Sequence, residues 1–117
     1  MIIINLSSQK PFTTRDGSEI RSLLDLSSAP VKNQSLAEAR LAAGAATERH
    51  YHRDSEEFYY VLDGHASMEI DGECREVGPG DAILIPAGAR HQIKTQEGVR
   101  FLCCCAPPYR HEDTYFE

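Results

Sequence analysis

Apolar and polar residues follow one another along most of this chain in short runs that glycine and proline separate. Phe58–Leu62, Ala82–Ile85 and Val99–Cys105 are apolar enough for buried strands, while Ser67–Asp71 alternates polar with apolar positions. Many short strands with such punctuation in a short chain are typical of an all-β sandwich or barrel. The pattern therefore predicts an all-β fold.

Two turn sequences support this fold class. Asp71-Gly72 lies between two alternating runs and is typical of a tight β-hairpin. Gly78-Pro79-Gly80-Asp81 has the composition of a tight turn before the next apolar strand. Both turns keep consecutive strands close together in the chain.

Residues 1–33 have a different pattern. Ile2–Leu6 predicts a short strand. Asp16 can cap a helix that Glu19 supports by reaching back, and the apolar residues that follow have helical spacing. This predicts one short N-terminal helical segment near Ser18–Asp25.

The rest of the chain divides into a β region, residues 34–106, and a C-terminal tail, residues 107–117. Ser35–Ala43 alternates in the way of a strand, although its alanines and leucine also suit a helix. The polar end of the tail, His111–Glu117, is expected on the surface. Because the repeated strand period argues against a separate second domain, we expect one domain over residues 1–117.

The composition of the chain disfavours two classes of binding partner. The 117 residues carry a formal net charge of −6 with no basic cluster, which disfavours binding to nucleic acid or to an anionic membrane. The N-terminal apolar run is too short for a signal peptide or a membrane span. We therefore expect a cytoplasmic protein whose partner is a small molecule.

Four cysteines occur, at positions 74, 103, 104 and 105. Without a secretory signal we expect free thiols, and three adjacent cysteines lack the spacing of zinc ribbons. On a strand, Cys103 and Cys105 would share one face and Cys104 the other. Small core residues are the simplest interpretation, with a redox or auxiliary metal role as the alternative.

The candidate metal-ligating residues lie in His50–Gly64 and around His91. On a strand His50 and His52 point to the same side, where two imidazoles can converge on one ion. Glu56 and Glu57 follow a polar break that can turn the chain back beside them. Three imidazoles and a carboxylate suit one divalent first-row metal ion, such as Fe, Mn, Ni, Cu or Zn.

These residues carry a resemblance to the cupin superfamily, in two motifs that 15 residues separate. The first motif reads Gly44, five residues, His50-x-His52, four residues, Glu57, six residues, Gly64. The second reads Gly80, five residues, Pro86-x-Gly88, two residues, His91. The spacing resembles that of small, single-domain bacterial cupins. Thr95 stands where the second motif commonly has Asn, at a position that is not a usual ligand.

The resemblance implies a double-stranded β-helix, or jelly-roll barrel, with a metal held inside by His50, His52, Glu57 and His91. The spacing to Gly64 selects Glu57 over Glu56, and strand parity agrees, because Glu57 shares the interior face with Tyr59. The family also implies a homodimer, with Ile2–Leu6 as a segment that two copies can exchange.

Two further residues are candidates for catalysis. Tyr59 faces inward by parity and can hydrogen-bond a substrate, although barrel packing also explains it. Glu48, inward by the same parity, can act as an acid or base, although a solvated carboxylate at the rim is the alternative. Arg40 can bind an anionic substrate or form a surface ion pair.

The leading functional hypothesis is a metal-dependent enzyme of dioxygenase, decarboxylase, isomerase or cyclase type that acts on a small oxygenated organic molecule. Four protein ligands leave coordination positions open for such chemistry. The alternative is a non-catalytic cupin that binds a sugar or carboxylate. A third reading is a barrel in which the metal only stabilises the fold.

Overall fold

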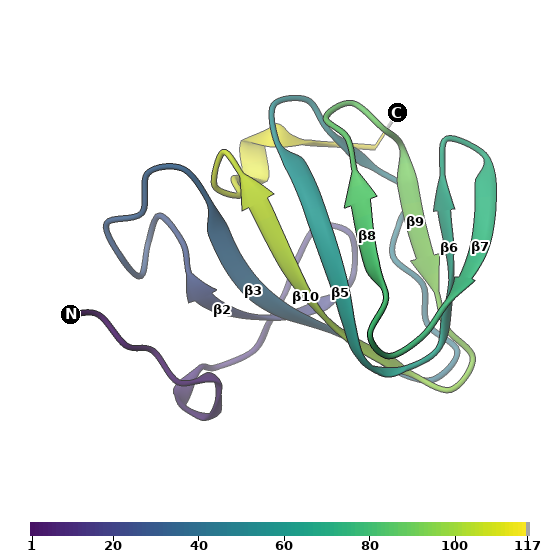
Figure 1. The fold of residues 1–117 in the computed structure, drawn as a ribbon, viewed down its shortest axis with the longest axis horizontal. Helices are drawn as coiled ribbons and strands as arrows, with labels where there is room; N and C mark the ends of the chain where they lie inside the picture. The colour runs from purple at the N-terminus through teal and green to yellow at the C-terminus, as the bar shows by residue number, and fades with distance from the viewer. Residues whose placement is uncertain (117) are drawn as a thin grey trace.

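The computed structural model describes residues 1–116, and their fold is all-β (Figure 1). Helical structure in this part of the chain is limited to two 3₁₀ turns, η1 (Leu6–Ser8) and η2 (His111–Asp113), and no described helix is long and apolar enough to cross a membrane. The strands are β1 (Phe12–Thr13), β2 (Glu19–Leu24), β3 (Ser35–Leu41), β4 (Tyr51–His52), β5 (Glu56–Gly64), β6 (Ala66–Ile70), β7 (Glu73–Val77), β8 (Ala82–Ile85), β9 (His91–Lys94), β10 (Val99–Ala106) and β11 (Thr114–Tyr115).

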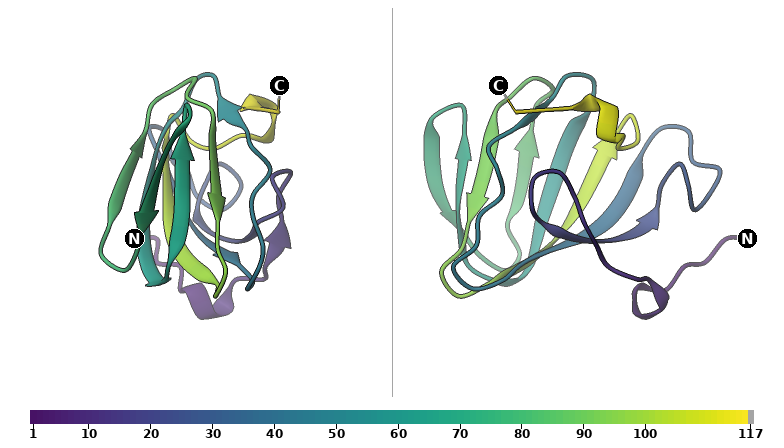
Figure 2. Two further views of the ribbon diagram at one scale, coloured as in Figure 1. Left: turned by 90° about the vertical axis from the view of Figure 1, so that its right-hand side faces the viewer. Right: turned by 180° about the vertical axis from the view of Figure 1, so that it is seen from behind.

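The strands form two sheets and one short pair. A six-stranded sheet has the order β1-β2-β3-β10-β5-β8, and a three-stranded sheet has the order β7-β6-β9. The remaining pair, β11-β4, lies near the end of the barrel that the C-terminal segment crosses (Figure 2). Isolated bridges from Ala46 to Lys94 and from His50 to His91 connect the chain before β4 to β9. The hydrophobic core lies between the two sheets.

Strand β5 shows how the sequence builds this core. Glu57, Tyr59 and Val61 are buried while Phe58 and Tyr60 are exposed, which confirms the predicted alternation. The largest fully buried apolar side chains are Phe101, Ile85, Ile93 and Val61. Each contributes about 1.5–3 kcal/mol relative to an exposed position.

The predicted turns are confirmed. Asp71 and Gly72 have φ values of 49° and 91° and join β6 to β7 in a two-residue hairpin, for which such residues are favoured. The Asp81 N–H donates to the Gly78 carbonyl at 3.0 Å and closes the turn before β8. Gly64 is the most constrained glycine, because a Cβ there would lie 2.1 Å from the Gly98 carbonyl oxygen.

The helix predicted near Ser18–Asp25 is wrong, because the segment forms strand β2 (Glu19–Leu24). It pairs with β3, with Ile20 opposite Ala39. So short a helix gains little from its own hydrogen bonds, whereas pairing with β3 satisfies the backbone along its length. The capping signal is real but serves a turn, since Asp16 Oδ1 accepts the Ser18 N–H at 2.9 Å.

Two other predictions at the termini are wrong. Ile2–Leu6 forms no strand, and Leu6 instead begins η1, which the Asn5 side chain caps. The tail is not wholly at the surface, because Asp113 and Thr114 are buried and β11 pairs with β4. Glu117, the last residue of that tail, lies outside the described residues.

Two predictions for the β region are confirmed. The segment Ser35–Ala43 forms a strand, β3 (Ser35–Leu41), and not the rival helix. All four cysteines are free thiols. Cys103 and Cys105 line the interior cavity, while Cys104 lies on the opposite side of β10, beside Leu36.

Candidate metal centre

Three histidines from different parts of the chain meet inside the barrel. His50 and His91 exchange backbone hydrogen bonds of 3.0 and 2.8 Å, which holds the start of β9 against the chain just before β4. His52 lies on β4, and all three side chains are buried. One ring nitrogen of each lies within 4.8 Å of the others. The structure thus brings together the three imidazoles that the motifs indicated.

A hydrogen bond from Nδ1 to a backbone carbonyl fixes the orientation of each imidazole ring. In every case Nδ1 lies within hydrogen-bond distance of a backbone carbonyl oxygen, which can only accept, so Nδ1 carries a proton. In a neutral ring the lone pair then lies on Nε2, the atom a metal would need. The three bonds run from His50 to Glu48 (2.8 Å), from His52 to Asp113 (3.1 Å) and from His91 to Ala89 (3.0 Å).

Glu57, the second residue of β5, faces the rings of His52 and His91. Its Oε1 lies 3.4 Å from His52 Nε2 and 3.6 Å from His91 Nε2. Among the buried side-chain nitrogen and oxygen atoms of residues 1–116, Glu57 Oε1 and His91 Nε2 have no hydrogen-bond partner. A buried unsatisfied polar atom costs about 1–3 kcal/mol, so two facing each other indicate a site that a ligand satisfies.

The electrostatics of the site favour an ionised carboxylate. Burial raises the pKa of Glu57, but the imidazoles of His52 and His91 outweigh this and hold the pKa well below its usual range. Burial lowers the pKa of His50, and repulsion from His91 lowers it further. Burial also lowers the pKa of His52, but the Glu57 carboxylate, 3.4 Å away, outweighs burial and raises the pKa of His52 above its usual value. An anionic oxygen among imidazole nitrogens is a donor set that first-row divalent cations accept.

The second oxygen of Glu57 is held by a cysteine. Cys105 lies opposite Glu57 in the register of β10 and β5, and its Sγ is 3.4 Å from Glu57 Oε2. Burial raises the pKa of the Cys105 thiol, and the Glu57 charge raises it further. Cys105 therefore stays protonated and donates to Oε2, which leaves Oε1 for the histidine side.

Asp113, on η2, holds the loop that follows β4 and also contacts His52. Its carboxylate accepts the backbone N–H groups of Arg53, Asp54 and Ser55 at 3.0–3.2 Å. Its own carbonyl oxygen accepts the His52 Nδ1 hydrogen. Sequence reasoning missed Asp113, since no local pattern relates it to a loop nearly sixty positions earlier.

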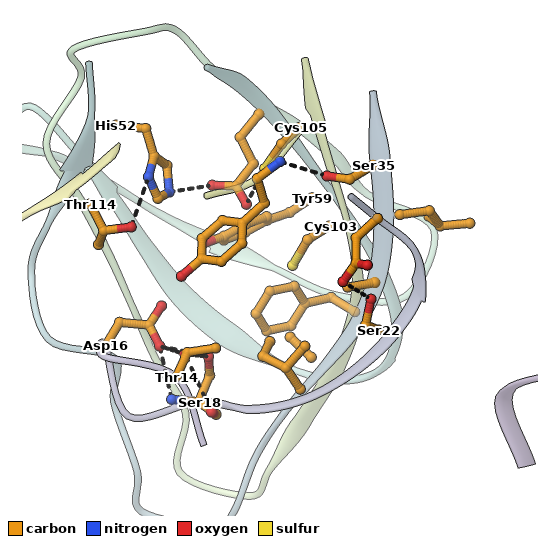
Figure 3. Close-up of a pocket in the computed structure, with 18 of the residues that line it drawn as sticks. Thr14, Asp16, Ser18, Ser22, Ser35, His52, Tyr59, Cys103, Cys105 and Thr114 are labelled. Atoms are coloured by element: carbon orange, nitrogen blue, oxygen red, sulfur yellow. Dashed lines mark hydrogen bonds and ion pairs between the residues drawn. The ribbon is translucent and has the colours of Figure 1, made fainter. Parts of the chain in front are cut away.

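The two candidate catalytic residues lie in different environments. Tyr59 lines the cavity, packs against Phe101 with ring centroids 4.5 Å apart, and in Figure 3 points its hydroxyl toward the space between Thr114 and Asp16. Burial raises the pKa of Tyr59 well above its usual value, so the hydroxyl remains a donor. Glu48 is exposed, against the parity prediction, because the chain at this position is not a regular strand.

Asp16 is a carboxylate of the cavity that sequence reasoning assigned only to a helix cap. It lies on the loop between β1 and β2, and its Oδ2 is 3.6 Å from His50 Nε2. The turn around Asp16-Gly17-Ser18 was visible in the sequence. Its distant partner was not, because only the path of the N-terminal segment across the barrel brings Asp16 to His50.

Comparison with known proteins gives matches over most of the chain. Residues 37–105 match the family model described as Cupin domain. The chain is 47% identical over 107 residues to the uncharacterized protein MJ1618 of Methanocaldococcus jannaschii, covering 90% of this chain and 86% of that one. It is 30% identical over 96 residues to the tetracenomycin polyketide synthase protein TcmJ of Streptomyces glaucescens, covering 82% of this chain and 64% of TcmJ. The solved structure of the polyketide cyclase RemF from Streptomyces resistomycificus superposes with a TM-score of 0.80 at 28% identity, covering 97% of this chain and 89% of RemF.

Proposed function

Since the chain belongs to the cupin family, we propose that it is a metal-dependent enzyme acting on a small oxygenated organic molecule. One divalent first-row ion would be held by His50, His52, His91 and Glu57. The observation that carries the proposal is the pair of buried, unpartnered atoms at its centre, Glu57 Oε1 and His91 Nε2.

The residues fit such an ion. Three rings are each fixed through Nδ1 so that Nε2 is free to ligate, and the carboxylate stays ionised. When bound, the ion would act as a Lewis acid on a substrate oxygen or, if redox active, would support oxidation. Tyr59 would donate a hydrogen bond to a substrate oxygen inside the cavity.

Among the reaction types that the family offers, a cyclase-type reaction on an oxygenated carbon skeleton has the most support. The names of TcmJ and RemF connect both relatives to polyketides, and RemF aligns with nearly the whole chain. This chain spans 64% of TcmJ, so that support rests mainly on RemF. A dioxygenase, decarboxylase or isomerase would use the same metal centre.

Metal content tests the proposal most directly. Protein purified without chelators is expected to carry about one transition-metal ion per chain by elemental analysis, and His91→Ala is expected to lose it. A matched control is His65→Ala, which removes an exposed histidine. Protein without stoichiometric metal, together with a His91→Ala variant unchanged in every assay, would falsify the proposal.

The homodimer implied by the family resemblance stays a prediction. Phe58, Tyr60 and Leu84 are exposed on the outer face of β5 and β8, with Phe58 opposite Leu84 in register, and a second copy would cover them. Light scattering is expected to give twice the mass of one chain, and Phe58→Glu is expected to reduce it to one. A monomer in the wild type would end this prediction.

A further inference from the structure

The cavity beside the metal centre has an unusual balance of charge. Its walls include apolar side chains from several strands, among them Ile20, Ala39 and Phe101. Three carboxylates line it, those of Asp16, Asp25 and Glu57, and none of the described residues that line it is lysine or arginine.

A bound metal ion would not make the cavity attractive to anionic ligands. A divalent ion brings two positive charges, and a carboxylate ligand at Glu57, beside His52 and His91, offsets one of them. A carboxylate at Asp16, 3.6 Å from His50 Nε2, offsets the other. An anionic substrate would then lose its hydration without gaining a free positive charge, which is unfavourable in a buried site.

Hydrogen bonds hold the Asp16 carboxylate through one oxygen, so its other oxygen can accept a hydrogen bond from a ligand. Its Oδ1 accepts three hydrogen bonds, from the Thr14 hydroxyl (2.6 Å), the Ser18 N–H (2.9 Å) and the Ser18 hydroxyl (2.6 Å). Its backbone carbonyl accepts the Glu48 N–H at 2.7 Å, which ties the loop to the chain just before His50. Oδ2 is therefore the oxygen that faces the metal side of the cavity, as Figure 3 shows for the side chain as a whole.

We infer that Asp16 determines the substrate class: the cavity takes a neutral compound with an apolar body and a hydroxyl or enol group, whose O–H donates to Asp16 Oδ2. This inference rests on the proposed metal-dependent function. Glu57 and Asp16 flank the three histidines, Glu57 beside His52 and His91 and Asp16 beside His50. Glu57 completes the ligand set, and Asp16 contacts the substrate.

A pair of probes that differ by one carboxylate tests the inference. Catechol and 3,4-dihydroxybenzoate both offer two phenolic hydroxyls, but only the second carries a carboxylate. Titration calorimetry on the metal-loaded protein is expected to give catechol at least about 10-fold tighter binding, because the benzoate carboxylate and the cavity carboxylates carry charges of the same sign and repel. Metal content is measured on the same samples.

Two variants assign the discrimination to Asp16. Asp16→Asn removes the charge at similar volume, so the preference for catechol is expected to fall to about 2-fold or less. Glu19→Gln removes an equal charge three positions along the same segment, from a side chain that is 48% exposed, and is expected to leave the preference unchanged. Both variants are expected to load metal stoichiometrically, because all four proposed ligands are unchanged.

The outcomes separate the two proposals. The inference is overturned if the wild type binds the benzoate as tightly as catechol, if it binds neither probe, or if Asp16→Asn keeps the wild-type preference. Protein that holds no metal defeats the proposed function instead, and this is read from elemental analysis and not from the probes. A catechol preference that disappears in Asp16→Asn alone is the supporting result.

Discussion

The two walls of the cavity are built on different principles. On the barrel wall, the Nδ1 atoms of His50, His52 and His91 donate to backbone carbonyl oxygens; those of His50 and His91 use a carbonyl two residues earlier, and that of His52 uses the distant Asp113. On the N-terminal wall, residues 12–25, the carboxylates of Asp16 and Asp25 instead accept hydrogen bonds from hydroxyl and backbone N–H groups of their own neighbours. The barrel wall is suited to holding an ion in fixed geometry, and the N-terminal wall to selecting what binds beside it.

This difference predicts that the two walls can be changed separately. Substitutions on the barrel wall should alter metal affinity, whereas substitutions on the N-terminal wall should alter ligand preference and local stability.

Glu57→Gln should have the largest effect on metal binding. It removes the anionic donor whose Oε1 lies unpartnered between His52 and His91. We expect metal affinity to fall at least about 100-fold, the upper end of what loss of a supporting residue alone produces. Competition with a chromophoric chelator measures it. Glu56→Gln, an exposed neighbour on β5, is the control, and equal behaviour of the two variants would exclude Glu57 as a ligand.

Asp113→Asn should lower both the metal affinity and the stability of the protein. The carboxylate accepts N–H groups from three consecutive residues, and the carbonyl of the same residue positions His52. We expect the metal-free protein to lose about 1.5–3 kcal/mol of unfolding free energy, and metal affinity to fall about 10-fold. Urea unfolding and chelator competition give the two values. Asp54→Asn, an exposed carboxylate paired with Arg110, should change neither quantity beyond about 0.5 kcal/mol.

Replacing Cys105 should weaken metal binding less than Glu57→Gln does, and only when its hydrogen bond to Glu57 is lost. Cys105→Ala removes the donor to Glu57 Oε2, whereas Cys105→Ser keeps one. We expect metal affinity about 10-fold weaker in the alanine variant, at the lower end of the range for groups that support a ligand, and substantial recovery in the serine variant. The visible spectrum of the Co²⁺-loaded protein should shift in the same order. Cys104→Ala, on the other face of β10, serves as the reference, and an identical loss there would mean that packing alone is responsible.

Asp25 on the N-terminal wall should influence stability only in acid. Burial raises the pKa of Asp25, but hydrogen bonds from Ser22, Ser27 and Ser28 outweigh this and lower the pKa to about 2 from its usual 3.8. The unfolded chain then binds a proton more readily than the folded one, so this stability is present above about pH 4 and is lost as the pH falls toward 2.

After allowance for solvent screening we expect this contribution to be about 1 kcal/mol. Urea unfolding of the metal-free protein at pH 5 and pH 2.5 should show a smaller pH dependence in Asp25→Asn than in the wild type. Metal affinity at neutral pH should not change. An Asp25→Asn variant with impaired metal binding would contradict the separation of the two walls.

Much of the barrel wall could be predicted because its information is local. The strand period of two places Glu57, Tyr59 and Val61 on one face, and the structure confirms that alternation. The same reasoning failed at Glu48, where the chain leaves regular strand geometry and parity has no meaning. It also failed at Ser18–Asp25, where pairing with β3 outweighed a weak helical pattern.

The all-β class and the hairpin at Asp71-Gly72 could be predicted from the chain alone, because they depend on periods and turn residues that lie within a few positions of one another. That His91 meets His50 and His52, about forty positions earlier, was implied by the resemblance to cupins and not by any local pattern. Three contacts could be seen only once the fold was known: Asp16 faces His50, Asp113 supports His52, and Cys105 donates to Glu57. Each of these pairs joins residues more than thirty positions apart, and its contact depends on how the sheets close around the cavity.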